Sequence, residues 1–108
     1  MNNKLKGILG ICRKAGKMSI GHDAVIGSVK NGHAKLVICC ADASQRLKRE
    51  ISDECSYMDR DVPYEEAAFD KNALSLAIGN PAAVISIDDA GFAKKVYIEM
   101  TGGNASGS

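Results

Sequence analysis

The sequence predicts an α/β fold with three layers, in which helices cover both faces of a central sheet. Segments with apolar residues at helical spacing alternate along the chain with short apolar runs, and the run 36–41 is apolar on both of its faces. A strand of that kind is typical of a sheet covered by helices on both sides. The chain has 108 residues, 45% of them hydrophobic, which is enough for one compact domain.

The first half of the chain is expected to contain two helices and a strand ahead of the apolar run. The first helix is predicted by four apolar residues at helical spacing, Leu5, Ile8, Leu9 and Cys12. Gly16 ends it, in the position where a left-handed cap is usual. Residues 17–20 are expected to form a short strand. The next helix runs from about His22 to Asn31, and Gly32 terminates it.

The second half continues the alternation of helices and strands. Residues 42–45 can cap a third helix, whose apolar face carries Leu47, Ile51, Cys55 and Met58. A turn follows, and then a short strand at about 63–66, where Pro63 indicates the start of the strand or an edge position. Asp70 can cap a fourth helix that ends at Gly79. The last strand covers 83–87.

The last helix extends from about Asp89 to Met100. We therefore expect residues 1–100 to form a single domain. Residues 101–108 contain no packing residues, so this segment is expected to be a disordered tail.

Charge is segregated along the chain, although the net charge is only +1. Residues 1–50 hold ten lysines and arginines against three acids, a net +7, and the rest holds four against ten, a net −6. This asymmetry indicates a nucleic-acid face, because local potential governs affinity for phosphate chains. Ordinary solvated helix faces are the alternative. Four residues, Lys6, Arg13, Lys14 and Lys17, are expected to form a basic ridge that ends beside Gly21.

The four cysteines predict buried, reduced thiols. Cys12, Cys39, Cys40 and Cys55 form no paired Cys-x-x-Cys spacing, and each lies in an apolar stripe or strand. Neighbouring residues of a regular strand point to opposite faces, so a disulfide between Cys39 and Cys40 is not expected. Nothing in the spacing brings these thiols together with His22 or His33 as metal ligands.

Several function classes are disfavoured. No apolar run approaches the roughly 18 residues of a membrane-spanning helix, and the first residues lack the apolar core of a signal peptide, which predicts a cytoplasmic protein without a membrane partner. The sequence shows no glycine-rich phosphate loop and no histidine with a matched acid and nucleophile. We therefore expect a noncatalytic protein without a cofactor. A small enzyme or nucleotide binder is the alternative, because doubly covered sheets often bind nucleotides.

The start of the second helix is the strongest candidate site. A glycine opens this short helix, so the backbone amides of Gly21, His22 and Asp23 are expected to face outward as an anion site that can hold a phosphate. The alternatives are a solvent-exposed histidine in a first turn and an ordinary capping carboxylate.

Several motifs carry a resemblance to a known family. They are Gly21-x-x-x-Val25, the turn and strand at 31–37, the exit at 41–44, Leu74-x-x-Ala77-Ile78-Gly79 and the segment 92–95. From about Lys4 to Val96 the chain resembles the L7Ae/L30e superfamily of ribosomal proteins, and bacterial YlxQ-type members fit best. The resemblance implies the same α/β/α sandwich with a mixed sheet of about four strands. It also implies binding of structured RNA, typically the sharply bent kink-turn.

By position, the resemblance places the RNA site on the loop Ser19 to Asp23 and on the loop at about Ala68 to Ala73. In the kink-turn binders the glycine is followed by a polar residue, Asn, Glu and, three residues later, Lys. Here those places hold His22, Asp23, Ala24 and Gly27. Asp23 can still accept a hydrogen bond from a base, whereas Ala24 and Gly27 offer no polar side chain.

These arguments predict a noncatalytic, ribosomal-type RNA-binding protein acting in ribosome assembly or translation. Its partner would be a bent or looped RNA, such as ribosomal RNA. The expected RNA contacts are Lys14, Lys17, Gly21, His22, Asp23, Lys71 and Asn72. The alternative is an adaptor that keeps the fold but binds mainly protein, through the acidic second half of the chain.

Overall fold

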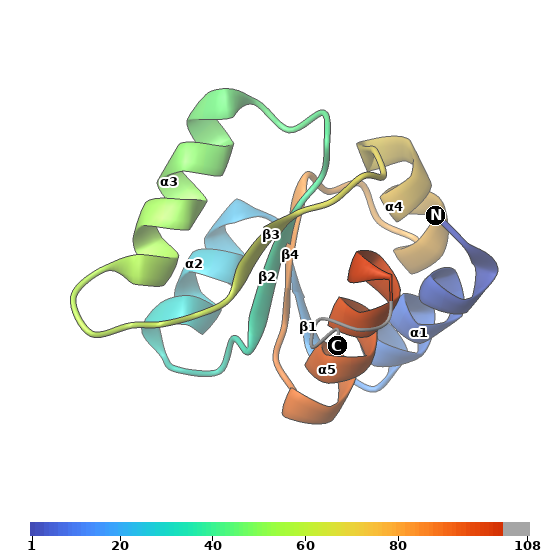
Figure 1. The fold of residues 1–108 in the computed structure, drawn as a ribbon, viewed down its shortest axis with the longest axis horizontal. Helices are drawn as coiled ribbons and strands as arrows, with labels where there is room; N and C mark the ends of the chain where they lie inside the picture. The colour runs from blue at the N-terminus through green and yellow to red at the C-terminus, as the bar shows by residue number, and fades with distance from the viewer. Residues whose placement is uncertain (103–108) are drawn as a thin grey trace.

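A computed structural model describes residues 1–102 of the protein, with helices and strands alternating along the chain (Figure 1). Four helices start at a side-chain cap, where oxygens of Asn2, Ser44, Asp70 and Asp89 accept backbone N–H groups of the first turns. The elements are α1 (Asn3–Lys14), β1 (Met18–Ile20), α2 (His22–Lys30), β2 (Leu36–Cys39), α3 (Gln45–Ser56), β3 (Tyr64–Glu66), α4 (Lys71–Ile78), β4 (Val84–Ile87) and α5 (Ala90–Thr101).

The four strands form one mixed sheet in the order β1-β4-β2-β3. β2 runs parallel to β3, with Val37 opposite Tyr64, and β4 lies antiparallel to both β1 and β2. The α/β fold with a mixed sheet of four strands is therefore confirmed. The last strand of the chain lies between the first and the second, and β1 and β3 form the two edges.

The helices cover both faces of this sheet. Leu36 and Ile38 of β2 pack in one core with residues of α1, α4 and α5, whereas Val37 and Cys39 pack in a second core with residues of α2 and α3. Figure 1 shows α2 and α3 on one side of the strands and the other three helices on the opposite side. This arrangement is the predicted three-layer α/β/α sandwich. None of the helices within residues 1–102 is long and apolar enough to cross a membrane.

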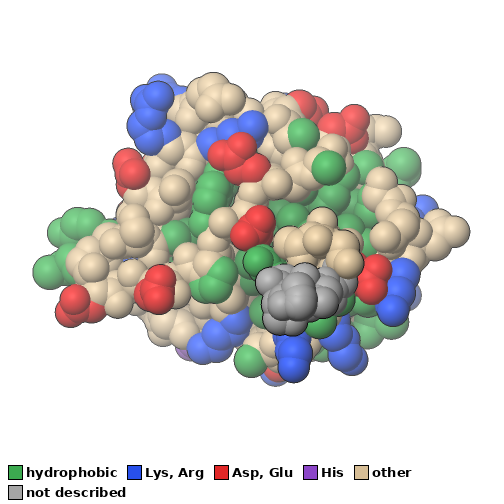
Figure 2. Space-filling view, viewed as in Figure 1, with side chains coloured by type: hydrophobic (Ala, Val, Ile, Leu, Met, Phe, Trp, Pro, Cys, Tyr) green, Lys and Arg blue, Asp and Glu red, His purple; other side chains and the backbone are tan. Residues whose placement is uncertain are grey.

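The prediction that Met58 lies on the apolar face of the third helix is wrong. α3 ends at Ser56, and Met58 is exposed with a left-handed φ of 55°. The helix ends here because Arg60 binds the turn that follows it back to the helix: the Arg60 guanidinium donates to both the carbonyl and the carboxylate of Glu54. Hydrophobic side chains therefore project from the tip beyond α3, at the far left of Figure 2.

α5 continues one residue beyond its expected end, to Thr101, and Gly102 caps it in the left-handed conformation. The rest of the expected tail, residues 103–108, lies outside the described part of the chain.

All four cysteines are buried and free, as predicted. Cys39 packs in the α2/α3 core and Cys40 in the opposite core, so the neighbouring thiols do point to opposite faces. Burial raises the pKa of Cys12 and Cys55 to about 11 and that of Cys40 to about 12. These thiols therefore stay protonated near neutral pH.

We expect the native protein to react slowly with a chromogenic disulfide reagent at pH 8, because the thiolate is the reactive form and these thiols are both buried and protonated. Labelling should become fast only when guanidinium unfolds the chain. The measurement compares the rates in the two conditions, and rapid modification of all four thiols in the native state would contradict the structural role.

Candidate nucleic-acid interface

The start of α2 is set by Gly21. This residue has φ 92° and ψ 167°, a conformation essentially reserved for glycine, and no side chain caps the helix behind it. Its N–H donates to the carbonyl of Val84 over 2.9 Å, which joins the end of β1 to the start of β4. The expectation that the Gly21 amide faces outward is therefore wrong. The amides of His22 and Asp23, in the first turn, have no acceptor within residues 1–102.

Backbone hydrogen bonds connect this glycine to the other candidate loop. Beyond the Gly21–Val84 bond, the N–H of Cys40 donates to Ala83 and the N–H of Ala41 donates to Phe69. These bonds place the two predicted loops at the same end of the sheet, about 14 Å apart across three strand intervals. We call this end the sheet-end surface; it consists of residues 21–23, 70–72 and 80–83.

The middle segment, 80–83, was not predicted as part of the site. The sequence marks Asn80-Pro81 only as a turn, and its position beside Gly21 follows from the antiparallel pairing of β1 with β4. In the amide orientation that satisfies its neighbours, the Asn80 side chain accepts from Arg13 Nη2 at 3.1 Å and donates to the carbonyl of Gly79. Arg13 thus brings a positive charge from α1 to this segment.

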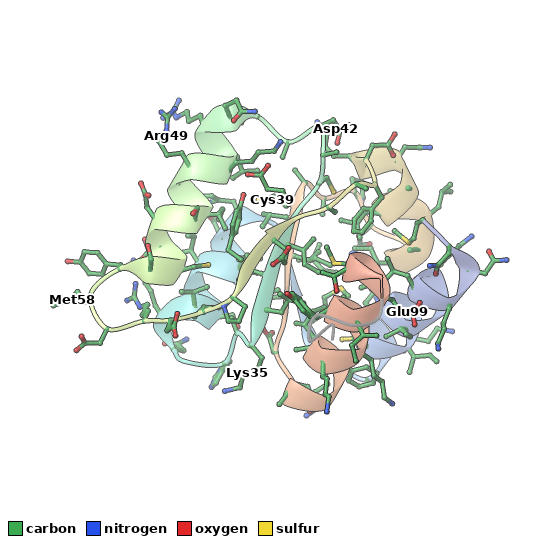
Figure 3. The ribbon with its side chains drawn as sticks, viewed as in Figure 1. Lys35, Cys39, Asp42, Arg49, Met58 and Glu99 are labelled. Carbon is green, nitrogen blue, oxygen red and sulfur yellow. The ribbon has the colours of Figure 1, made fainter. Side chains whose placement is uncertain are left out.

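Two carboxylates occupy the start of α4 and disfavour binding of an anion there. Asp42 accepts the backbone N–H of Lys71 at 2.9 Å, and Asp70 accepts that of Ala73 at 2.8 Å. Figure 3 shows Asp42 at this end of the sheet, beyond β2, and Lys35 at the opposite end. The backbone N–H of Asn72, between Lys71 and Ala73, has no acceptor within residues 1–102, and the side chains of Lys71 and Asn72 are exposed on the sheet-end surface.

His22 lies between two acids. Its Nδ1 is 2.8 Å from Asp23 and its Nε2 is 2.7 Å from Glu50, which comes from the middle of α3. The hydrogen bonds that the ring makes to Asp23, above all, and to Glu50 raise the pKa of His22 above its ordinary value. The His22 ring therefore connects α2 to α3. In its protonated form it also partly neutralises the two carboxylates next to the free amides.

We expect a ring-proton NMR titration to place the pKa of His22 above that of an ordinary histidine, and Asp23→Asn and Glu50→Gln each to lower it. Because the folded pKa exceeds the unfolded one, the stabilisation by this contact is complete below the unfolded pKa and is lost as pH rises through the folded value. Asp53→Asn, also on α3, is the matched control. If the pKa of His22 is the same in the Asp23→Asn and Glu50→Gln proteins as in the parent, the two acids do not hold the ring.

Two members of the basic ridge, Lys14 and Lys17, lie away from the sheet-end surface. Lys17 precedes β1, where its carbonyl accepts the N–H of Asp88, whereas Gly21 follows the other end of the strand. Four residues of extended chain separate them, about 13 Å. The expectation that the ridge ends beside Gly21 is therefore wrong, because β1 carries the chain away from Lys14 and Lys17 to the other end of the sheet, although Arg13 of the same ridge reaches Asn80.

The sheet-end surface offers hydrogen-bond donors and acceptors. Within residues 1–102, no group of three or more His, Cys, Asp or Glu side chains could hold a metal ion. The exposed groups of the sheet-end surface include the backbone amides of His22, Asp23 and Asn72, the carboxylates of Asp23 and Asp70 and the side chain of Lys71. Arg13 adjoins this surface at Asn80, and residues 82–83 are small. Such an arrangement can bind a polar, anionic surface such as folded RNA.

Comparison with known proteins agrees with this description. The model of the ribosomal protein L7Ae/L30e/S12e/Gadd45 family matches residues 3–97. Two proteins named RNA-binding protein YlxQ are each 36% identical: that of Enterococcus faecium over 92 residues, 85% of this chain and 86% of that protein, and that of Bacillus subtilis over 90 residues, 82% and 87%.

Two solved structures share the fold. A Bacillus halodurans protein of unknown function superposes with a TM-score of 0.84 at 29% identity, covering 93% of this chain and 99% of the other. A 15.5kD RNA-binding protein of Giardia lamblia superposes with a TM-score of 0.66 at 26% identity, covering 94% and 88%. With the family model matched over nearly the whole chain, and a sequence that carries the expected motifs, this protein belongs to the ribosomal protein L7Ae/L30e/S12e/Gadd45 family.

Proposed function

We propose that this protein is a noncatalytic RNA-binding protein and that its sheet-end surface holds a bent or looped RNA. The proposal is supported by family membership and by the names of the YlxQ relatives and the Giardia structure. The observation that carries it is the start of α2, where the amides of His22 and Asp23 have no acceptor within residues 1–102 and lie beside the small residues of segment 80–83.

The chemistry of this surface favours contacts with base edges near α2. The free amides can donate to base acceptors, and the fully exposed carboxylate of Asp23 can accept from a base amino group. Glycine at position 21 and alanines at 82 and 83 allow a base to approach the backbone closely. Phosphates are disfavoured next to Asp23 and Glu50, so they would be bound by Arg13 and Lys71 at the rim.

Lys14 and Lys17 belong to the proposal in a second role. Since they lie at the opposite end of β1, they would contact phosphates only on an RNA that continues along the molecule. A bent RNA with two arms satisfies this condition. Action on ribosomal RNA in the cytoplasm, during ribosome assembly or translation, is the setting we propose, and crosslinking in cells followed by sequencing of the bound RNA tests it.

The direct experiment is fluorescence anisotropy with a labelled kink-turn RNA and an unbent duplex of the same composition, over a salt series. Arg13→Ala with Lys71→Ala should weaken binding and flatten the salt slope by roughly one unit per lost contact, and Lys14→Ala with Lys17→Ala should do so for a two-armed RNA. The matched control is Lys94→Ala with Lys95→Ala in α5. Equal slopes in every variant would remove these residues from the interface.

Restoring the two polar groups of the family pattern should increase selectivity for bent RNA. We expect Asp23→Asn with Ala24→Glu to raise affinity for the kink-turn by about 1 kcal/mol per regained base contact, and to leave duplex binding unchanged. The pair keeps a net charge of −1, so the effect cannot arise from phosphate attraction. Anisotropy with both RNAs measures it, and equal effects on the two would mean that this loop does not read a kink-turn.

A protein-binding adaptor is the second candidate, and the acid pair around His22 favours it. Asp23 and Glu50 place two carboxylates at the point where an RNA binder of this fold would meet its ligand. If the purified protein binds neither RNA and carries no nucleic acid that high salt removes, the adaptor becomes the stronger conclusion.

A further inference from the structure

On the side of the edge strand β3 that faces away from β2, backbone groups have no partner within residues 1–102. Its strand partner is β2, on one side. The carbonyl of Pro63 and the N–H of Ala67 both bond to β2, so odd-numbered residues turn their backbone groups toward the sheet. The groups of Tyr64 and Glu66 consequently point away from β2. Figure 1 shows this strand facing the viewer, between α3 and α5.

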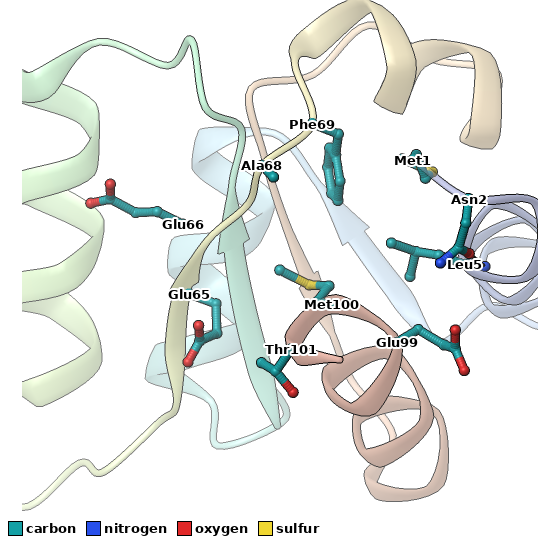
Figure 4. A pocket seen from close by; sticks show the side chains of 10 residues that line it. All are labelled: Met1, Asn2, Leu5, Glu65, Glu66, Ala68, Phe69, Glu99, Met100 and Thr101. Carbon is teal, nitrogen blue, oxygen red and sulfur yellow. Dashed lines mark hydrogen bonds between the residues drawn. The ribbon is translucent and has the colours of Figure 1, made fainter. Parts of the chain in front are cut away.

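A groove follows this edge on the α5 side. Two cavities, of about 320 and 360 Å³, lie end to end along β3, and Glu65 lines both. The first has Leu5, Phe69 and Met100 among its lining residues, as the close view in Figure 4 shows. The second is lined by Leu36, Ala93 and Tyr97 on its apolar side. The groove thus combines apolar walls with the free edge of a strand.

Charge along the groove is polarised. Glu65 is half-buried and forms no ion pair within residues 1–102, whereas Glu66 pairs with Lys48 and Glu99 with Lys4. All three acids line the first cavity, at the Ala68 end of the strand. Lys35 and Lys94 line the second, at the Pro63 end. A bound segment would therefore meet acids at one end and lysines at the other.

The same charges argue against a second copy of this chain. Antiparallel pairing of β3 with itself would bring Glu65 and Glu66 of one copy close to those of the other, and like charges opposite each other destabilise a sheet. The complementary occupant is a strand with basic side chains.

We propose that an extended segment of a partner protein adds to β3 as a fifth strand, with basic side chains beside Glu65 and Glu99 and an acidic one beside Lys35 and Lys94. Main-chain hydrogen bonds to Tyr64 and Glu66 would supply affinity, and the groove would supply specificity. The groove lies along β3 on the α5 side, whereas the sheet-end surface lies beyond the strand ends, so this segment and an RNA that contacts α2 and segment 80–83 can be bound together.

The test titrates the isotope-labelled full chain with a capped heptapeptide that has valine at alternate positions, lysines near one end and a glutamate at the other. We expect NMR shifts and slower hydrogen exchange at the amides of Tyr64 and Glu66. A peptide with glutamate in place of each lysine should bind at least about fivefold more weakly, as should the Glu65→Lys and Glu65→Gln proteins with the original peptide. Asp59→Lys, a charge reversal outside the groove, should bind like the parent.

Three results would overturn the proposal: no binding by the lysine peptide, equal binding by the two peptides, or shifts elsewhere without protection of β3. Concentration-dependent dimerisation of the free chain through β3, measured by sedimentation, would also overturn it in favour of self-association. RNA affinity of the Glu65→Gln protein should stay within twofold of the parent. This last measurement separates a failure of the groove from a failure of the RNA proposal.

Discussion

Replacing Asp88 with alanine is expected to lower the free energy of unfolding by about 3 kcal/mol. The carboxylate accepts three hydroxyl hydrogen bonds, from Ser19 at 2.6 Å, Ser28 at 2.7 Å and Ser86 at 2.8 Å. These serines belong to β1, α2 and β4, so one side chain connects an edge strand, a helix and a central strand. Ser86 is fully buried and Ser28 nearly so, and both would lose their acceptor.

Urea unfolding monitored by circular dichroism measures this loss, and the melting temperature should fall by roughly 12–24 °C. Asp88→Asn keeps the shape and one acceptor oxygen, and so should cost less than the alanine variant. Asp53→Ala, a carboxylate on α3, is the surface control and should change stability by less than about 0.5 kcal/mol. If Asp88→Ala costs no more than that control, the three bonds do not stabilise the fold.

Gly21→Ala is expected to destabilise the protein by about 2 kcal/mol and to weaken RNA binding by displacing the start of α2. The cause is backbone strain alone, since a Cβ at this position would have nothing within 4 Å, whereas a φ of +92° is unfavourable for any L side chain. A shift of the first turn moves the amides of His22 and Asp23, the groups on which the RNA proposal rests.

Gly27→Ala is the matched control for this substitution. Gly27 lies within α2, has an ordinary helical φ and also has open space at its Cβ position. It should stabilise the protein by about 0.5–1 kcal/mol, because alanine is the better helix former. The two variants add the same methyl group to one helix with opposite expected signs. Thermal unfolding and RNA anisotropy of both proteins test the prediction, and a loss of similar size in both would show that strain at Gly21 is not the cause.

The two proposed binding surfaces lie on different parts of the sheet. The proposed RNA surface lies beyond the strand ends, from Gly21 after β1 to Lys71 after β3, and the proposed peptide groove lies along the side of β3. The adaptor alternative need not exclude RNA binding, because the acidic half of the chain supplies much of the groove and the basic half supplies α1 and α2.

The sequence by itself determined the elements and the layers. Helical spacing, the predicted caps at 42–45 and Asp70, and the glycine at 79 depend on neighbours within a few residues, and the structure has helix ends where they predict them. The apolar run at 36–41 predicted a strand with helices on both sides for the same reason, because alternate side chains of a strand face opposite layers. The prediction for Met58 was wrong because the turn that places it outside α3 depends on contacts of Arg60, which local spacing does not show.

Only the tertiary structure decided which residues share a site. Strand order placed β4 between β1 and β2, which brought segment 80–83 beside Gly21 and put Lys17 at the far end of β1. It also brought Glu50 to His22, 28 residues away along the chain. The spacing of apolar residues along the sequence predicts whether a segment is a helix or a strand and which of its faces is buried. The choice of strand partner depends instead on how the separate cores pack together. The functional surface is therefore a property of the assembled sheet.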